Sequence, residues 1–225
     1  DVKLINPSIY LDQDKNGQWL DNLEKIASNF DREAPIRLNL GFQVEKGAIT
    51  IQPYALKKPI EIKADGQGRF IDNQRQPLTY DFSAEILKSQ VKIQGETALK
   101  TGESLTNLQI DRLNLSQLLT LIPNRNFQLN QGQVNANIAL NIPSWAKLNK
   151  TEGNGDFQVT DVAGKFQPFQ YPIKLTTKLN LQGDKVLVEQ ASATIGKIKT
   201  EVRGEVNWQT GYHLNVALES VDLQQ

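Results

Sequence analysis

The chain has 225 residues and balances 25 basic against 25 acidic side chains, so its formal net charge at pH 7 is zero. This balance argues against a nucleic-acid-binding protein and against a polybasic membrane-surface patch, since both need an excess of Lys and Arg. The chain has no Cys, which excludes disulfides and thiolate metal sites. Its length fits one large all-β unit or two small domains.

Methionine is absent, even at position 1, and we therefore expect a mature product or an internal segment of a longer protein. No stretch approaches the length of about eighteen apolar residues that a membrane-spanning helix needs, and no signal peptide is evident. We expect any membrane anchor to lie outside this segment.

The N-terminal stretch predicts an extended segment followed by a turn. Val2 to Leu11 has the pattern of an extended segment that Pro7 interrupts, and Asp14-Lys15-Asn16-Gly17 is a strong turn signal. The segment Leu23–Phe30 spaces its apolar residues three and four apart. This spacing fits a short amphipathic helix or an ordered loop equally well.

The next part of the chain alternates apolar and polar residues at the spacing of an all-β meander. The predicted strands are Ile36–Glu45, Ala48–Gln52, Ile60–Gly68, Leu78–Leu87, Gln90–Lys100 and Leu105–Leu113. The predicted turns between them include Glu45-Lys46-Gly47, Gln67-Gly68 and Lys88-Ser89. The alternation then stops, and we expect a helix of one to two turns that Asn114 or Ser116 caps and Pro123 ends.

The second half is more regular and predicts strands joined by short glycine-bearing turns. The strands are Gln133–Ile142, Gly155–Val162, Pro172–Gln182, Lys185–Ile195, Lys197–Trp208 and Tyr212–Leu223. The turns are Gly153-Asn154-Gly155, Ala163-Gly164, Gly183-Asp184, Gly196 and Thr210-Gly211. Short connections make successive strands antiparallel neighbours. The longer stretch Phe166 to Pro172 fits a crossover, a bulged edge or a loop.

These patterns predict an all-β fold, a curved antiparallel sheet with one or two short helices. About thirteen to fifteen strands spaced about 4.8 Å apart give a sheet roughly 65 to 70 Å across. An open sheet of that width must twist, curl or split into two layers. The result is a closed sandwich, a barrel or an elongated gutter with one apolar wall.

The sequence contains no recognisable catalytic constellation. His213 is the only histidine and alternates onto the polar side of its strand, where a solvated side chain is expected. Asp12, Asp14 and Asn16 resemble the alternating oxygen ligands of a calcium loop. Leu23 occupies the position of the bidentate Glu, however, and this favours a plain turn. We predict no enzyme activity, no metal site and no cofactor.

The three tryptophans are candidates for stacking on sugars, but two of them have a simpler interpretation. Trp208 continues the apolar alternation of its strand, which favours packing in a core or groove. Trp19 follows a turn, and we expect it to plug the end of the apolar layer. Trp145 follows Pro143-Ser144 in a loop and is the best candidate for an exposed aromatic side chain.

The repeated apolar face has two interpretations. Either two sheets cover each other and the face is an ordinary core, or the sheet stays open along one edge and the face holds an apolar ligand. The face is mainly Val, Ile and Leu with some Ala, Thr and Phe, and we expect such a wall, without directional groups, to suit acyl chains of any length. Burying a sixteen-carbon chain would be worth about 12 kcal/mol at roughly 0.8 kcal/mol per methylene.

Several segments resemble the AsmA/TamB superfamily, and most of all the cyanobacterial TamB proteins, relatives of a plastid inner-envelope translocon component. The run Asn6–Leu20 is similar to the family's start, an apolar-Pro-x-Val-Tyr-Ile-x-x-Asp-x-x-Gly-x-Trp pattern. Other similar segments are Gly47–Pro53, Leu113–Leu119, Val162–Gly164 and Gly204–Asn215. Together they spread over essentially the whole chain, and their order gives the match its specificity.

The resemblance implies a large envelope-spanning protein that is anchored in the inner membrane, with this segment in the periplasm. Such proteins form a β-taco, a long U-shaped sheet with a hydrophobic groove, similar to chorein-type bridge lipid-transfer proteins. They are implicated in phospholipid movement to the outer membrane and in outer-membrane protein assembly. The resemblance also implies an Omp85-type outer-membrane partner, engaged by a region outside this segment.

We therefore expect a single β-taco segment of a lipid conduit over residues 1–225, whose partners are phospholipid acyl chains and neighbouring segments of the same chain. The expected groove lining is Val134, Ala136, Ile138, Leu140, Ile173, Leu175, Leu179, Leu181, Val202, Val206, Trp208, Leu214, Val216 and Leu218. A second hypothesis is an assembly scaffold that holds substrate strands by edge pairing. A third, an enzyme or sugar binder, would need a polar cluster around Trp145 or His213.

Overall fold

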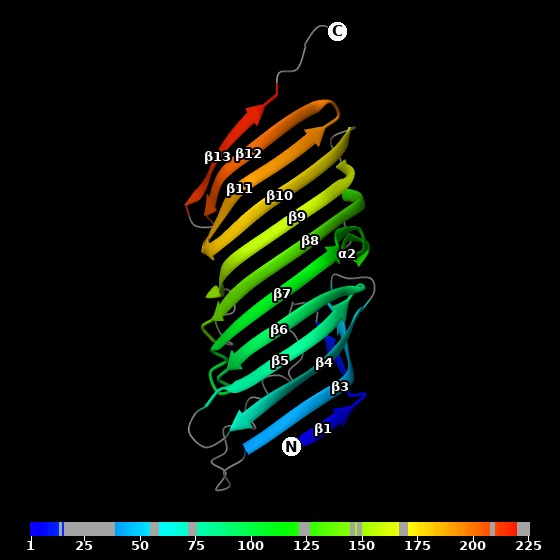
Figure 1. Ribbon diagram of the computed structural model, residues 1–225, viewed down its shortest axis with the longest axis vertical. Helices are drawn as coiled ribbons and strands as arrows, with labels where there is room; N and C mark the ends of the chain where they lie inside the picture. Colours follow the sequence, from blue (N-terminus) through cyan, green and yellow to red (C-terminus); the bar gives the residue numbers. More distant parts are fainter. Residues whose placement is uncertain are drawn as a thin grey trace. The chain divides into compact units, whose positions relative to one another are not determined.

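The computed structural model describes residues 1–13, 15, 39–54, 59–71, 76–121, 127–144, 147, 150–166, 171–207 and 210–219. Over these residues the chain is all-β, and its strands form one open, hydrogen-bonded sheet with one short helix (Figure 1). The elements are β1 Val2–Ile5, β2 Ser8–Asp12, β3 Asn39–Gln52, β4 Ile60–Ile71, β5 Leu78–Ile86, β6 Ser89–Thr97, β7 Ser104–Asn114, α2 Leu115–Leu121, β8 Phe127–Ile142, β9 Glu152–Phe166, β10 Pro172–Gly183, β11 Lys185–Ile195, β12 Ile198–Asn207 and β13 Gly211–Leu218.

From β3 to β13 each strand is bonded to its neighbours in sequence, as a meander requires. The predicted fold class, a curved and mainly antiparallel sheet with a short helix, is confirmed. A closed sandwich or barrel is wrong for the described chain, because the strand order has two free ends, β1 and β13. The chain divides into two compact units: unit 1 contains Asp1–Gln109 and Ala139–Thr151, and unit 2 contains Ile110–Ile138 and Glu152–Gln225.

Unit 1 begins with a parallel edge, which the sequence did not predict. Both β1 and β2 pair with β3 in the parallel sense, and together they form one edge strand with a break at Asn6-Pro7. At the break Asn6 takes a left-handed φ of 53° and its N–H donates to the Glu45 carbonyl at 2.9 Å. The predicted interruption at Pro7 is confirmed. The Leu23–Phe30 segment lies outside the described residues.

The predicted strands Ile36–Glu45 and Ala48–Gln52 are a single strand, β3, and the predicted turn between them is a β-bulge. The register with β4 shifts at this point by one residue. Lys46 has a left-handed φ of 54°, and its N–H donates to Oδ1 of Asp65 at 2.7 Å. Because the extra residue offsets the alternation, the apolar residues on either side of the bulge stay on one face.

Several glycines that predicted turns instead lie inside strands. Gly66 and Gly68 stand in the middle of β4, where a Cβ on either would meet an aromatic ring of a neighbouring strand. Gly66 lies under the Phe82 ring and Gly68 lies under the Phe42 ring, and the two ring centroids are 6.4 Å apart. The predicted turns at 67–68, 153–155 and 163–164 are therefore wrong, because close cross-strand contacts use these glycines.

Unit 2 contains α2, which begins where the sequence predicts. Oδ1 of Asn114 accepts the Gln117 N–H at 3.0 Å and the Ser116 hydroxyl at 2.7 Å, so Asn114 is the cap. Beyond the helix, β9 and β10 are antiparallel neighbours, with Lys165 opposite Pro172. This pairing excludes a crossover among the three interpretations of the Phe166 to Pro172 stretch.

The turn between β5 and β6 is Leu87-Lys88, one residue earlier than predicted, and it is conformationally costly. Ile86 pairs with Ser89, which leaves a two-residue loop with φ values of 51° and 65°. A type I′ hairpin turn requires positive φ at both positions, which Asn-Gly adopts readily and Leu-Lys does not.

Replacing the second turn residue should therefore stabilise the protein. We expect Lys88→Gly to raise the free energy of unfolding by about 1 kcal/mol, because glycine adopts positive φ without the Cβ clash. The matched control is Lys63→Gly in the extended, exposed middle of β4, which should lower it by roughly 0.5–1 kcal/mol. Urea denaturation of both variants measures the difference. Equal effects of the two substitutions would contradict the turn assignment.

Candidate functional site

The predicted lining residues of unit 2 lie on one face of its sheet, which we call the unit 2 face. Residues directly opposite each other on paired strands share a face. Leu181 on β10 is opposite Val186 on β11, Val186 is opposite Val206 on β12, and Val206 is opposite Tyr212 on β13. The other predicted residues of β10, β12 and β13 share this phase: Ile173, Leu175, Leu179, Val202, Leu214, Val216 and Leu218.

Residues of strand β8 also lie on the unit 2 face, as the position of Gly155 on the neighbouring strand β9 indicates. A Cβ on Gly155 of β9 would lie 3.0 Å from the Cα of Ile138, and Gly155 is itself opposite Leu181. Val134 and Ala136 alternate with Ile138 onto this face. Two predicted lining residues fall elsewhere: Leu140 belongs to unit 1, and Trp208 lies outside the described residues.

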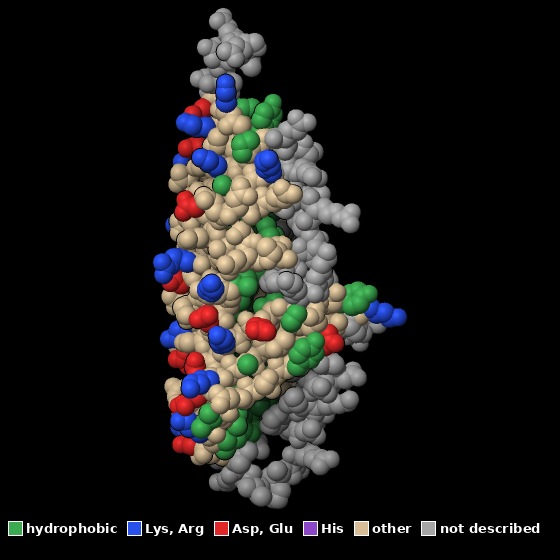
Figure 2. Space-filling model, turned by 90° about the vertical axis from the view of Figure 1, so that its right-hand side faces the viewer, with side chains coloured by type: hydrophobic (Ala, Val, Ile, Leu, Met, Phe, Trp, Pro, Cys, Tyr) green, Lys and Arg blue, Asp and Glu red, His purple; other side chains and the backbone are tan. Residues whose placement is uncertain are grey.

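Exposure on the unit 2 face rises from β8 toward β13. Val134 is 3% exposed and Ile138 is 9% exposed, whereas Val216 is 61% and Leu218 is 68% exposed. Among the described residues of the whole chain, no side chain is fully buried. Figure 2 shows charged side chains gathered along one side of the sheet and hydrophobic side chains emerging on the other. The face is thus a partly covered wall and not a closed core.

Sequence reasoning missed the contribution of β9 and β11 to this face. Bulges in both strands shift the alternation by one residue, at Thr160-Asp161 and at Glu189-Gln190. A simple period of two therefore loses its phase inside each strand. The apolar residues that these strands add are Phe157, Val159, Val162, Val186, Val188, Ala191, Ala193 and Ile195.

Two threonines stand among the apolar side chains of the unit 2 face, Thr177 of β10 and Thr200 of β12. Thr177 of β10 lies between Leu175 and Leu179 on the unit 2 face, and it is 8% exposed. Its hydroxyl has no hydrogen-bond partner. The expectation of a wall without directional groups is therefore wrong at this position.

The opposite face of unit 2 carries paired charges and amides. Lys178 Nζ lies 2.6 Å from Oε2 of Glu189, and Asn180 Nδ2 donates to Oδ1 of Asp156 at 3.1 Å. The hydrogen bond and the charge of Glu189 raise the pKa of Lys178 above its ordinary value. The Lys178 and Glu189 side chains are 54% and 40% exposed, which marks this side as the water-facing one.

Unit 1 has an apolar face of its own, with a chain of hydroxyls at one end. Tyr80 Oη lies 2.7 Å from Oγ1 of Thr106, and Oγ1 of Thr97 lies 2.8 Å from Oγ of Ser104. Oγ of Ser104 in turn donates to the Gly102 carbonyl at 3.2 Å. These hydroxyls therefore have hydrogen-bond partners within unit 1.

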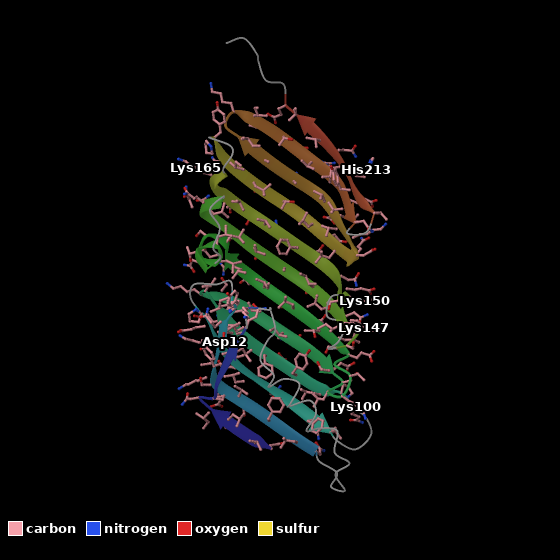
Figure 3. The ribbon with its side chains drawn as sticks, turned by 180° about the vertical axis from the view of Figure 1, so that it is seen from behind. Asp12, Lys100, Lys147, Lys150, Lys165 and His213 are labelled. Carbon is pink, nitrogen blue, oxygen red and sulfur yellow. The ribbon has the colours of Figure 1, made fainter. Side chains whose placement is uncertain are left out.

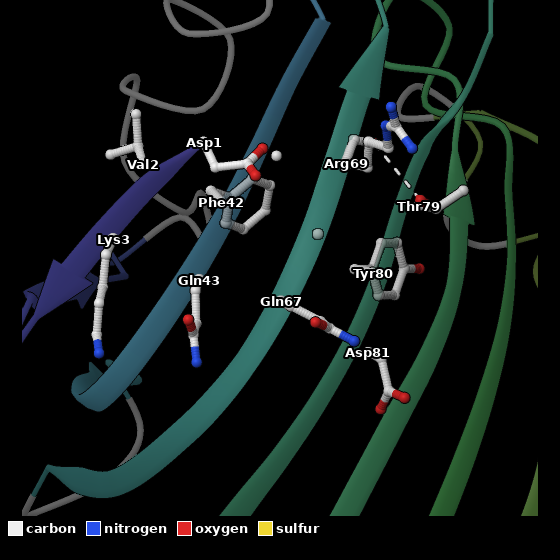
Figure 4. A pocket seen from close by; sticks show the side chains of 12 residues that line it. Asp1, Val2, Lys3, Phe42, Gln43, Gln67, Arg69, Thr79, Tyr80 and Asp81 are labelled. Atoms are coloured by element: carbon white, nitrogen blue, oxygen red, sulfur yellow. Dashed lines mark hydrogen bonds between the residues drawn. The ribbon is translucent and has the colours of Figure 1, made fainter.

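A shallow pocket of about 610 Å³ in unit 1 lies over β1, β3, β4 and β5 (Figure 4). Its charged side chains have both signs: Asp1, Lys3, Arg69 and Asp81. The two cations already have partners, since Lys3 pairs with Glu45 and Arg69 donates to Asn39. The pocket contains none of the predicted lining residues. Its charged side chains do not share one sign that would attract a ligand of the opposite charge.

The remaining sequence candidates do not form a cluster in the part of the chain that is described. His213 is exposed on β13 opposite Glu205 (Figure 3). Within the same residues, no group of three or more His, Cys, Asp or Glu side chains could hold a metal ion. Asp14, Asn16, Trp19 and Trp145 lie outside the described residues. A search of the described helices finds none that could span a membrane.

Comparison with known proteins finds no matching family model, no matching curated protein and no matching solved structure.

Because exposure on the unit 2 face rises from β8 to β13, we expect an introduced Asp to cost more folding stability on β8 than on β13. We expect Ile138→Asp to lower the free energy of unfolding by at least about 3 kcal/mol, since it buries an unpaired carboxylate. Val216→Asp, on the exposed edge strand, should change it by no more than about 0.5 kcal/mol. Urea denaturation measures both variants. Similar large losses at both positions would mean that the β13 end of the face is covered in solution.

Proposed function

We propose that this chain is a segment of a bridge-like lipid conduit in which phospholipid acyl chains lie along the apolar face of the sheet. The observation that carries the proposal is an open sheet whose aliphatic side chains share one face and stay partly exposed from β10 to β13. Each methylene that an acyl chain removes from water against such a wall is worth about 0.8 kcal/mol. The chemistry suits lipid tails because the unit 2 face has no charged side chain among its described residues.

The conduit proposal includes the location and partners that the AsmA/TamB resemblance implies. The chain would lie in the periplasm as part of a protein anchored in the inner membrane, and neighbouring segments would continue the groove. Contact with an Omp85-type outer-membrane protein would involve a region outside this segment. These assignments rest on the resemblance of the segments around Asn6–Leu20 and Gly204–Asn215 together with the open apolar sheet.

Photo-crosslinking to labelled phospholipid tests the conduit directly. A photoreactive residue in place of Val202 faces the apolar wall, and one in place of Arg203 on the same strand faces the opposite side. We expect phospholipid to be labelled from position 202 at least about tenfold more than from position 203, because only the apolar face provides acyl-chain burial. Equal labelling from both positions, or none from either, would reject the proposal.

A second candidate is a scaffold for outer-membrane β-barrel assembly, favoured by the edge strand β13. Its eight residues carry no formal charge and no Pro, the usual devices that block edge pairing. Such an edge could add a strand of a substrate protein by backbone hydrogen bonding.

The scaffold function predicts a crosslinking result that differs from the result expected for the lipid conduit. A photoreactive residue in place of Asn215 on β13 should label an unfolded β-barrel precursor, and the additional change Leu179→Asp within the apolar wall should leave that labelling intact. The Leu179→Asp change should at the same time abolish lipid labelling from position 202, because it puts a charge on the wall. Absence of precursor labelling in the parent protein would remove the scaffold function.

A further inference from the structure

The unpaired hydroxyl of Thr177 is the most unusual group on the unit 2 face. Among the described residues, Thr177 Oγ1 is the one buried side-chain polar atom without a hydrogen-bond partner. The side chain as a whole is 8% exposed. Leaving a buried hydroxyl unsatisfied costs free energy that a valine of nearly the same shape would avoid.

The surroundings of Thr177 are apolar on all four sides along the sheet. Val159 of β9 and Ala191 of β11 are directly opposite it on the two neighbouring strands. Leu175 and Leu179 precede and follow it on the same face of β10. The nearest ion pair, Lys178 with Glu189, comes from residues that alternate onto the other face. None of these four neighbours has a side chain that could hydrogen-bond the hydroxyl.

Two other hydroxyls on the apolar faces have partners within the protein. Thr200 Oγ1 donates to the Ala217 carbonyl at 3.1 Å, and in unit 1 Thr97 lies 2.8 Å from Ser104. Thr177 is thus an exception to a pattern that the described chain otherwise follows.

We propose that the Thr177 hydroxyl donates a hydrogen bond to an ester carbonyl oxygen of an acyl lipid bound on the unit 2 face. This inference rests on the proposed lipid-conduit function and adds a polar contact to it. Hydrocarbon side chains flank Thr177 in both directions along β10, so its partner must be a polar group joined to apolar chains. A neutral ester meets this requirement, whereas a fatty-acid carboxylate would bring an unpaired charge to a face without described cations. A rotation of 120° about χ1 moves the hydroxyl to another staggered position without backbone movement.

The test compares an ester lipid with its ether analogue, which has the same chains but lacks the carbonyl groups. Dissociation constants for dipalmitoyl-phosphatidylcholine and the matching dihexadecyl diether are measured by displacement of a fluorescent fatty-acyl probe from the 225-residue protein. We expect Thr177→Val to weaken ester-lipid binding by about three- to tenfold and to leave diether binding unchanged, the size of one neutral hydrogen bond. Thr177→Ser keeps the donor and should bind the ester lipid as the parent protein does.

The outcomes separate the two proposals. If the parent protein and Thr177→Val bind ester and diether lipids with unchanged affinities, lipid binding stands and the Thr177 contact is overturned. If Thr177→Val weakens both lipids equally, its effect is one of packing and the contact is again overturned. If the parent protein binds neither lipid, the conduit function fails and this inference fails with it.

Discussion

The period of two in a β-strand is the constraint on which the rest of this structure depends. It sends every second side chain to the same side of the sheet, and the Val, Ile and Leu residues of successive strands therefore accumulate on one face. The sheet is open, so it does not close on itself to bury that face. The absence of any fully buried side chain among the described residues follows from this geometry. Stability must then come mainly from the backbone ladder and from cross-strand neighbours.

Long strands keep one face apolar only if their twist and phase are controlled, and the bulges provide this control. In β3 the bulge residue Lys46 has its N–H held by Asp65 of the next strand. In β7 the left-handed residue Arg112 is held in the same manner, its N–H donating to Oδ1 of Asn135 at 2.9 Å. Both strands therefore contain a left-handed residue whose N–H is held by a side chain of the next strand, and in β3 this residue belongs to the bulge that keeps the apolar set in phase.

Much of the fold could be predicted from the sequence, because one-sided alternation determines both strand identity and facing. Apart from Leu140, which belongs to unit 1, and Trp208, which lies outside the described residues, the predicted lining residues share the face that the alternation assigns to them. The turn predictions failed at glycines that lie inside strands and make room for side chains of a neighbouring strand. Gly66 and Gly68 make room for aromatic rings inside β4, although their sequence context indicates a turn. The parallel pairing of β1 and β2 could not be predicted either, since it depends on a distant partner strand and not on a local pattern.

The nearest-neighbour order of β3 to β13 has a consequence for how such a protein unfolds and how it can change in length. In an array of this kind the cooperative unit is a few adjacent strands, because each contributes a local stability and an interface with the next. One end can open while distant strands stay paired. A hairpin can likewise be inserted or deleted between two strands, lengthening or shortening the array by about 10 Å while the direction and facing of every other strand are retained. The span of the protein is therefore a quantity that evolution can adjust in steps of two strands.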